Sequence, residues 1–197
     1  MNRNAPETAE KGTIEAANYS KLITKNLCLR VLLFLLSLTA VVIMVTSKQT
    51  KLVTTPMLPY PVSITSKYTD TPAFIYFVVA LSLSLSYSFI TGLATLWYLK
   101  KPCSSKSLLE FYLVLIANDV VMVGVVAAAS GAGGFVGYIW LKGNSKVGWN
   151  KVCNIYGRFC KQIGTSIFIS IVVSILFAVL VVLSAYSVHR LARKASN

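Results

Sequence analysis

The sequence predicts an all-α membrane protein built as a bundle of four transmembrane helices. Of its 197 residues, 55% are hydrophobic and 13% are charged, whereas soluble domains are about 45–50% apolar and about 25% charged. Four apolar runs are each long enough to cross a hydrocarbon core about 30 Å thick, which takes roughly 20 helical residues. Those runs hold almost no charged residues, so each can lie in lipid.

The first helix is predicted over residues 27–46, and it carries no charge after Arg30. Residues 1–26 form a polar tail ahead of it. The first 20 residues of this tail are mixed in charge and are expected to be disordered. A cleaved signal peptide is not expected, because a polar stretch of this length does not precede the apolar core of such peptides.

The second helix is predicted over residues 71–99, which hold no charge. The loop before it contains Pro56, Pro59 and Pro61, a spacing that rules out a helix there. Its Val, Ile, Thr and Tyr content allows a short strand or a hairpin instead.

The third helix is predicted over residues 108–130, and it carries a bare acid, Asp119. Past Ser130 the chain reads GAGGFVG. Dinucleotide binding by these glycines would need a preceding strand and a following soluble helix, and neither is predicted. The glycines are therefore interpreted as a site of tight packing or as the outer end of the helix.

Small residues recur every four positions in three of the predicted helices, which places them on one face of each helix. Such faces let helices approach closely in lipid. Most of them are expected to pack within one bundle, and one is left for a neighbouring molecule. The residues are Ala80, Ser84, Ser88 and Gly92 in the second helix, Gly124 and Ala128 in the third, and Ser166, Ser170 and Ser174 in the fourth.

Arg30 and Asp119 are charges of opposite sign inside apolar runs. Counted from the predicted helix ends, Asp119 lies near the bilayer midplane and Arg30 is roughly 13 Å shallower. Arg30 could snorkel to the headgroups or pair with Asp119. Asp119 could serve in a buried pair that fixes which helices touch, act as an ion or proton site, or face water or a partner.

The last loop and helix complete the prediction. The loop holds Cys153 and Cys160, and two cysteines seven apart in an oxidising compartment can form a disulfide. A zinc site is less favoured because no histidine lies nearby. No catalytic residues, metal or cofactor are predicted. The fourth helix is predicted over residues 163–188, with a short tail at 189–197.

The net charge of +13 comes from 19 Lys and Arg against 6 Asp and Glu. The bases flank apolar runs and form no polar basic domain, so lipid headgroups are the expected partner and nucleic acid is not. Their density favours both termini on the cytosolic side. The dense inner clusters are Arg3, Lys11, Lys21, Lys25; Lys100, Lys101, Lys106; and Arg190, Arg193, Lys194.

Several segments together resemble the plant CASP-like family, the relatives of Casparian strip membrane domain proteins, and subfamily 1 in particular. They are LRVLLFLLSLTAVVIMVTSKQT, TDTPAFIYF, NDVVMVGVVAAASGA and GNSKVGWNKVCNIYGRFC. The family pattern of an arginine in the first span, an aspartate in the third and a cysteine pair in the second outer loop is matched by Arg30, Asp119, Cys153 and Cys160. The first outer loop, TTPMLPYPVSITSKY, lacks the acidic-aromatic stretch of the founding Casparian proteins.

The resemblance implies a MARVEL-like four-helix bundle with two extracellular loops and cytosolic termini, resident in the plasma membrane. It further implies a non-enzymatic scaffold that forms homo-oligomers and hetero-oligomers with related family members and recruits cell-wall-modifying enzymes. A different class stays open beside it: an oligomeric channel or transporter that uses Asp119 as an ion or proton site.

Overall fold

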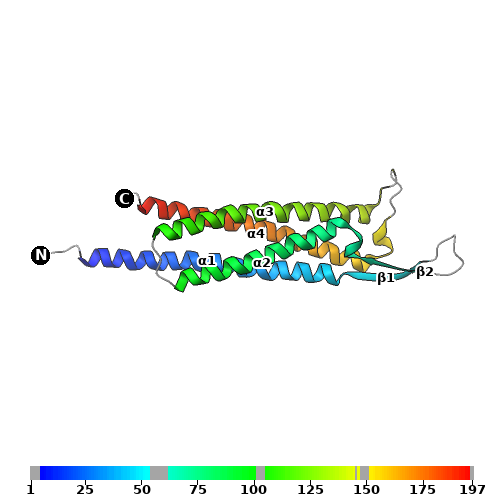
Figure 1. Ribbon diagram of the computed structural model, residues 1–197, viewed down its shortest axis with the longest axis horizontal. Coiled ribbons are helices and arrows are strands. Elements are labelled where there is room, and N and C mark those ends of the chain that lie inside the picture. The colour runs from blue at the N-terminus through cyan, green and yellow to red at the C-terminus, as the bar shows by residue number, and fades with distance from the viewer. Residues whose placement is uncertain (1–4, 54–61, 101–104, 145, 147–150, 196–197) are drawn as a thin grey trace.

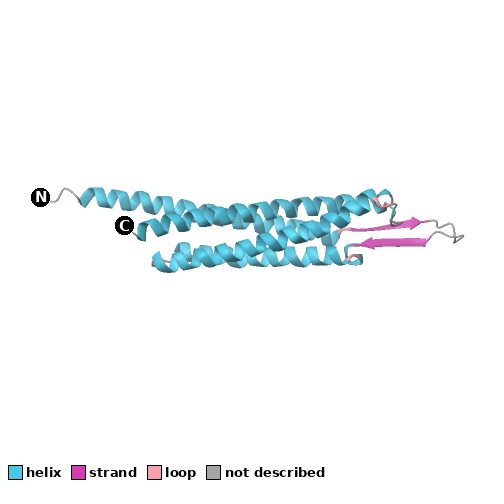
Figure 2. Cartoon of the chain, turned by 90° about the horizontal axis from the view of Figure 1, so that it is seen from above, coloured by secondary structure: helices cyan, strands magenta, loops and turns pink. Residues whose placement is uncertain are grey.

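The chain folds as an elongated bundle of four helices with a β-hairpin projecting from one end (Figures 1 and 2). The computed structural model describes residues 5–53, 62–100, 105–144, 146 and 151–195. The elements run in the order α1 (Ala5–Thr46), β1 (Lys48–Val53), β2 (Val62–Lys67), α2 (Pro72–Lys100), α3 (Ser105–Lys142) and α4 (Gly157–Ala195). The start of α1 and the end of α4 lie at the same end of the bundle (Figure 1).

Each of the four helices is long and apolar enough to cross a membrane. The qualifying segments are Thr24–Thr46, Pro72–Tyr98, Leu109–Lys142 and Gly157–His189. The predicted fold class, an all-α membrane protein with four spans, is therefore confirmed. The loop before α2 forms the strand pair that its composition allowed: β1 and β2 pair antiparallel, from Lys48 opposite Lys67 to Val53 opposite Val62.

Four helix boundaries differ from the sequence prediction by six residues or more. The helix α4 begins at Gly157 instead of 163 and ends at Ala195 instead of 188. The helix α1 begins at Ala5, although the first 20 residues were expected to be disordered; their Ala, Glu and Lys content has high helix propensity. The helix α3 continues to Lys142, twelve residues beyond the predicted end at 130. In lipid every backbone N–H and C=O needs an internal partner, so glycines in a span stay within the helix.

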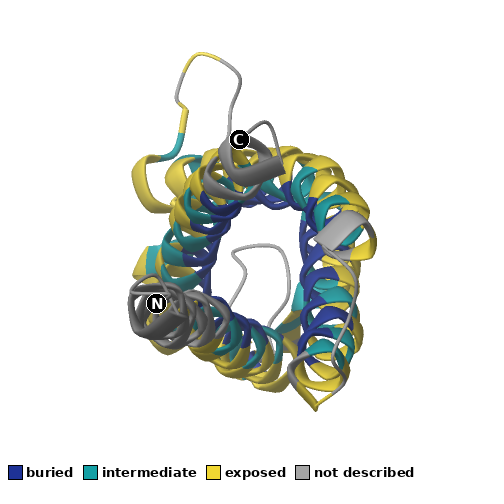
Figure 3. Cartoon of the chain, turned by 90° about the vertical axis from the view of Figure 1, so that its left-hand side faces the viewer, coloured by how far each residue is buried: buried dark blue, intermediate teal, exposed yellow. Residues whose placement is uncertain are grey.

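Burial follows the direction in which each side chain points relative to the bundle axis. The buried residues form stripes that face the axis, and the exposed ones cover the outside (Figure 3). On α1, Leu33, Ala40 and Met44 are fully buried, while Val31 and Leu35 are each 51% exposed. Such an apolar exterior is stable only against lipid or another apolar surface, as the membrane assignment requires.

The small-residue faces divide between the interior and the exterior of the bundle. The faces on α2 and α4 point inward: Ala80, Ser84, Ser88, Gly92, Ser166 and Ser170 are buried, and Ser174 is half-buried. The face on α3 points outward, because Gly124 and Ala128 are exposed.

Three hydroxyl contacts show how closely the inward small-residue faces let the helices approach. The hydroxyls of Ser37 and Ser84 lie 3.2 Å apart, and those of Ser130 and Ser170 lie 2.8 Å apart. Ser166 Oγ donates to the carbonyl oxygen of Ala40 across 2.7 Å. The Ser166 side chain of α4 thus contacts the backbone of α1, an approach that only small residues at the helix contact allow.

An aromatic cluster closes the hairpin end of the bundle. Trp140 of α3 and Phe74 of α2 pack in a T-shaped arrangement with ring centroids 5.2 Å apart, and Trp140 stacks on Phe159 of α4 at 5.7 Å. Phe74 and Phe159 are fully buried. Aromatic side chains thus connect three helices at this end of the bundle, next to the charged residues of the loops.

Candidate functional site

The structure brings Arg30 of α1 and Asp119 of α3 into contact in the bundle core. Arg30 Nη2 lies 2.9 Å from Asp119 Oδ2, and Arg30 Nη1 donates a longer bond of 3.4 Å to Asp119 Oδ1. Both side chains are completely buried. Arg30 therefore does not snorkel to the headgroups, and its guanidinium forks onto the carboxylate, the geometry in which such pairs are strongest.

The remaining donors of Arg30 reach two other polar groups. Its Nη1 donates to Thr91 Oγ1 of α2 at 2.6 Å, and its Nε donates to Asn26 Oδ1 one turn earlier on α1 at 3.0 Å. The amide of Asn26 in turn donates to Ser184 Oγ of α4 at 3.1 Å. A single guanidinium thus connects, directly or through Asn26, to all three other helices.

Tyr87 of α2 completes the pairing of the carboxylate. Its hydroxyl donates to Asp119 Oδ1 across 2.7 Å, and its ring centroid lies 5.9 Å from the Arg30 guanidinium carbon. One turn later on the same face, Thr91 donates its own hydroxyl to the carbonyl oxygen of Tyr87. Each oxygen of Asp119 therefore accepts at least one charge-assisted or neutral hydrogen bond, as a carboxylate in an apolar span requires.

The depth difference expected between the two charges does not keep their side chains apart, and α1 extends beyond the other helices at this end of the bundle (Figure 1). Arg30 lies about 37 Å along α1 from Ala5, whereas Asp119 lies about 21 Å along α3 from Ser105. The overhang of α1 at that end compensates for the longer distance. The estimate from predicted helix ends started this helix at residue 27, whereas it begins at Ala5.

Four members of this network, Asn26, Tyr87, Thr91 and Ser184, are absent from the sequence prediction. Neutral polar residues are frequent in these spans, so their type alone does not distinguish them. Spacing does carry a signal: Asn26 precedes Arg30 by four residues, and Tyr87 precedes Thr91 by four. Residues four apart share a helix face, so each pair presents two polar groups together.

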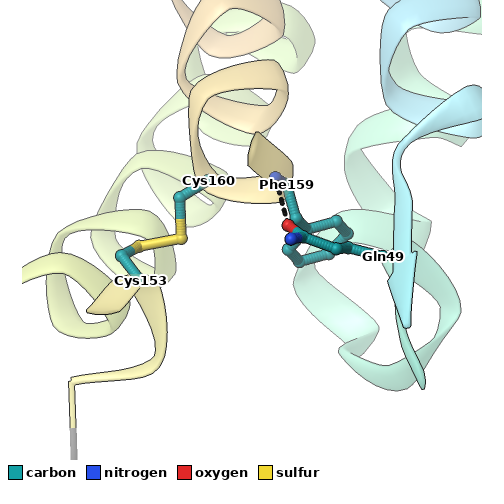
Figure 4. Close-up of a disulfide and its surroundings, with 4 residues drawn as sticks. All are labelled: Gln49, Cys153, Phe159 and Cys160. Carbon is teal, nitrogen blue, oxygen red and sulfur yellow. Dashed lines mark hydrogen bonds between the residues drawn. A yellow bond between two sulfur atoms is a disulfide. The ribbon is translucent and has the colours of Figure 1, made fainter. Parts of the chain in front are cut away.

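The second predicted site lies at the hairpin end. Cys153 and Cys160 form a disulfide with their Cα atoms 5.6 Å apart, joining the segment ahead of α4 to its first turn (Figure 4). Beside it, the Gln49 side chain of β1 accepts a 3.1 Å hydrogen bond from the Phe159 backbone N–H through Oε1 (Figure 4). The disulfide and this bond connect the start of α4 to the segment that precedes it and to the hairpin.

The fold and its core network define a class: a multi-pass membrane protein whose four helices meet at a buried ion pair. The chain belongs to the Casparian strip membrane protein domain family, whose model matches residues 20–176. The resemblance noted in the sequence is thereby confirmed.

Curated relatives match over most of the chain. It is 46% identical over 175 residues to CASP-like protein 1D1 of Populus trichocarpa, covering 88% of this chain and 86% of the relative. It is 44% identical to CASP-like protein 1D1 of Musa acuminata, covering 98% and 100%, and 41% identical to CASP-like protein 1D2 of Arabidopsis thaliana, covering 92% and 90%. No solved structure matches the chain.

Proposed function

We propose that this protein is a non-enzymatic scaffold of the plasma membrane that self-associates, joins related family members and recruits cell-wall-modifying enzymes. Both termini are on the cytosolic side, and the hairpin and the disulfide-bonded loop face outward to meet partners. The matched family is described as a membrane protein domain, and the names of the relatives are not enzyme names, which agrees with this proposal.

The observation that carries the proposal is the closure of the polar network. Arg30 and Asp119 bond to each other and to neighbours on α1 and α2, and Asn26 extends the network to α4. Neither charged side chain is exposed. A group that catalyses a reaction or carries an ion must meet its substrate. Here the charges are engaged in holding the helices, a role that specifies arrangement more than it adds stability.

The outward small-residue face of α3 supports self-association. A Cβ built on Gly124 meets no other atom within 4 Å, and Ala128 one turn later is also exposed. Packing drives helix association in lipid, and small residues allow the close approach that packing needs. A second copy with the same face fits this surface.

A tagged copy in the plasma membrane of a plant cell tests the scaffold. Fluorescence recovery after photobleaching should be slow and confined to bounded patches, and Gly124→Leu should speed it by disrupting self-association. Free diffusion of the unmodified protein would contradict the proposal.

The competing channel or transporter predicts a different result for Asp119→Asn. In reconstituted vesicles, that change would abolish a cation- or pH-dependent flux while assembly stays intact. The scaffold predicts no such flux for the unmodified protein and impaired assembly for the variant.

A further inference from the structure

A groove of about 280 Å³ lies between α3 and α4 near the hairpin end of the bundle. Its lining includes Gly134 and Gly137 of α3, Gly164 and Ile167 of α4, and the two cysteines of the disulfide. Tyr138 on its rim is 61% exposed, and Gly164 is exposed as well. The groove therefore opens toward the lipid and is lined mainly by apolar or side-chain-free residues.

Helix packing does not require the glycines that form this groove. A Cβ on Gly164 would meet nothing within 4 Å, and one on Gly134 or Gly137 would make ordinary contacts of 3.8 and 3.6 Å with Ile167. Gly133, which lies outside the groove, is different, because its Cβ would come within 3.3 Å of Phe77. The groove exists because side chains that would fit there are missing.

Basic residues lie close in sequence to the groove-lining residues at the hairpin end of both helices. Residues 141–161 contain five basic residues and no acidic one. Lys142 lies one turn beyond Tyr138 on the same face of α3, and Lys161 lies one turn before Gly164 on α4; both are exposed. The distance from Gly134 to Lys142 is about 12 Å along the helix. The groove is therefore apolar along the helices and has basic side chains near its hairpin end.

We infer that the groove binds an anionic glycerophospholipid, with an acyl chain along Gly134, Gly137 and Gly164 and the phosphate at Lys142 and Lys161. Lysine ammonium groups attract the phosphate of such a headgroup by charge and by hydrogen bonding. A second copy of this chain is disfavoured as the occupant, because copies inserted in the same orientation bring their basic loops together. A sterol would fill the apolar part and leave the charges unmatched. The site does not depend on the scaffold function.

Quenching of Trp140 fluorescence by brominated acyl chains tests the site, since Trp140 lines the groove. The variant Trp97→Phe/Trp149→Phe leaves Trp140 as the single tryptophan. One copy is placed in a nanodisc of phosphatidylcholine containing a small fraction of dibrominated phosphatidylglycerol or dibrominated phosphatidylcholine. The phosphatidylglycerol should quench more strongly. Gly164→Leu, which fills the groove, should make the two lipids equivalent.

Ala117→Leu is the control, because it introduces the same leucine at an exposed position of α3 outside the groove and should leave the preference for phosphatidylglycerol unchanged. Lys142→Gln and Lys161→Gln should each weaken the preference about fivefold, the ratio expected for one surface base. Equal quenching by the two lipids in the unmodified protein would overturn the inference. Unchanged preference in the lysine variants would overturn its headgroup assignment. Circular dichroism verifies that each variant retains its helices.

Discussion

The hydroxyl of Tyr87 donates a 2.7 Å hydrogen bond to the same carboxylate of Asp119 that Arg30 holds. Tyr87 is on α2 and Asp119 is on α3, so this bond ties a third helix to the ion pair between α1 and α3. A carboxylate in a membrane span is stable only when its lone pairs are occupied, and the tyrosine supplies a donor that Arg30 alone does not.

Tyr87→Phe should destabilise the bundle by about 1 kcal/mol, because it removes one hydrogen bond to a charged group and keeps the ring. The free energy of unfolding in detergent, followed by helicity, measures the loss. Tyr76→Phe is the matched control on the same helix, since Tyr76 is 45% exposed. Equal effects of the two changes would mean that the bond to Asp119 contributes nothing.

Asp119→Asn should be more harmful, at about 3 kcal/mol, because it leaves the guanidinium of Arg30 buried without its counter-charge. The double change Arg30→Met/Asp119→Leu removes both charges and should recover most of the lost stability. Recovered stability without recovered self-association would show that the pair sets the arrangement of the helices. If the double variant is as unstable as the single one, the loss has another origin.

Gly133→Val should loosen the contact between α2 and α3, since a Cβ at this position comes within 3.3 Å of Phe77 Cδ2. Overpacking of this kind costs about 1–3 kcal/mol. Gly131→Val, two residues earlier, is the control, because nothing lies within 4 Å of its Cβ. Thermal unfolding of the two variants in the same detergent should differ, and identical midpoints would contradict the packing shown here.

Gln49→Ala should release the hairpin from the start of α4 by removing the acceptor of the Phe159 N–H. Amide hydrogen exchange is expected to accelerate at Phe159 and in β1, while exchange in the middle of α4 stays slow. Lys51→Ala serves as the control, because it changes an exposed residue of the same strand. Unchanged exchange at Phe159 would show that the hairpin is held by other contacts.

Cys153→Ser should expose a reactive thiol at Cys160 and lower stability by about 2 kcal/mol, the value that loop closure predicts for a short ring. Titration with a membrane-impermeant thiol reagent counts the new group. Cys28→Ser, which changes a free and exposed cysteine, should leave stability unchanged. A thiol count at Cys160 that does not rise would refute the disulfide.

The sequence predicts the four spans because length and apolarity are set by the bilayer. Particular residues explain why the predicted end of α3 was wrong. The glycines from Gly131 to Gly137 break helices in water, and in lipid the backbone cannot leave the helix without losing hydrogen bonds. Phe77 then packs close to Gly133, because Gly133 has no side chain in the way. The sequence around these glycines does not show whether their tendency to break helices or the need for backbone hydrogen bonds in lipid prevails.

Only the charged residues of the candidate site could be predicted from the sequence. Arg30 and Asp119 are conspicuous because charged residues are rare in apolar runs. Asn26 and Ser184 are neutral, and their partnership across 158 positions depends on how α1 and α4 are placed side by side. Such long-range geometry follows from packing of whole helices, which periodicity within one helix does not reveal.

The position of Arg30 has a consequence for biogenesis. The cation is near the beginning of the chain and its anion is 89 positions later, so a nascent protein that has inserted α1 and α2 carries an unmatched charge in the bilayer. Final closure of the bundle must wait until α3 is synthesised. Chains truncated before Asp119 would leave that charge exposed to the quality-control machinery of the membrane.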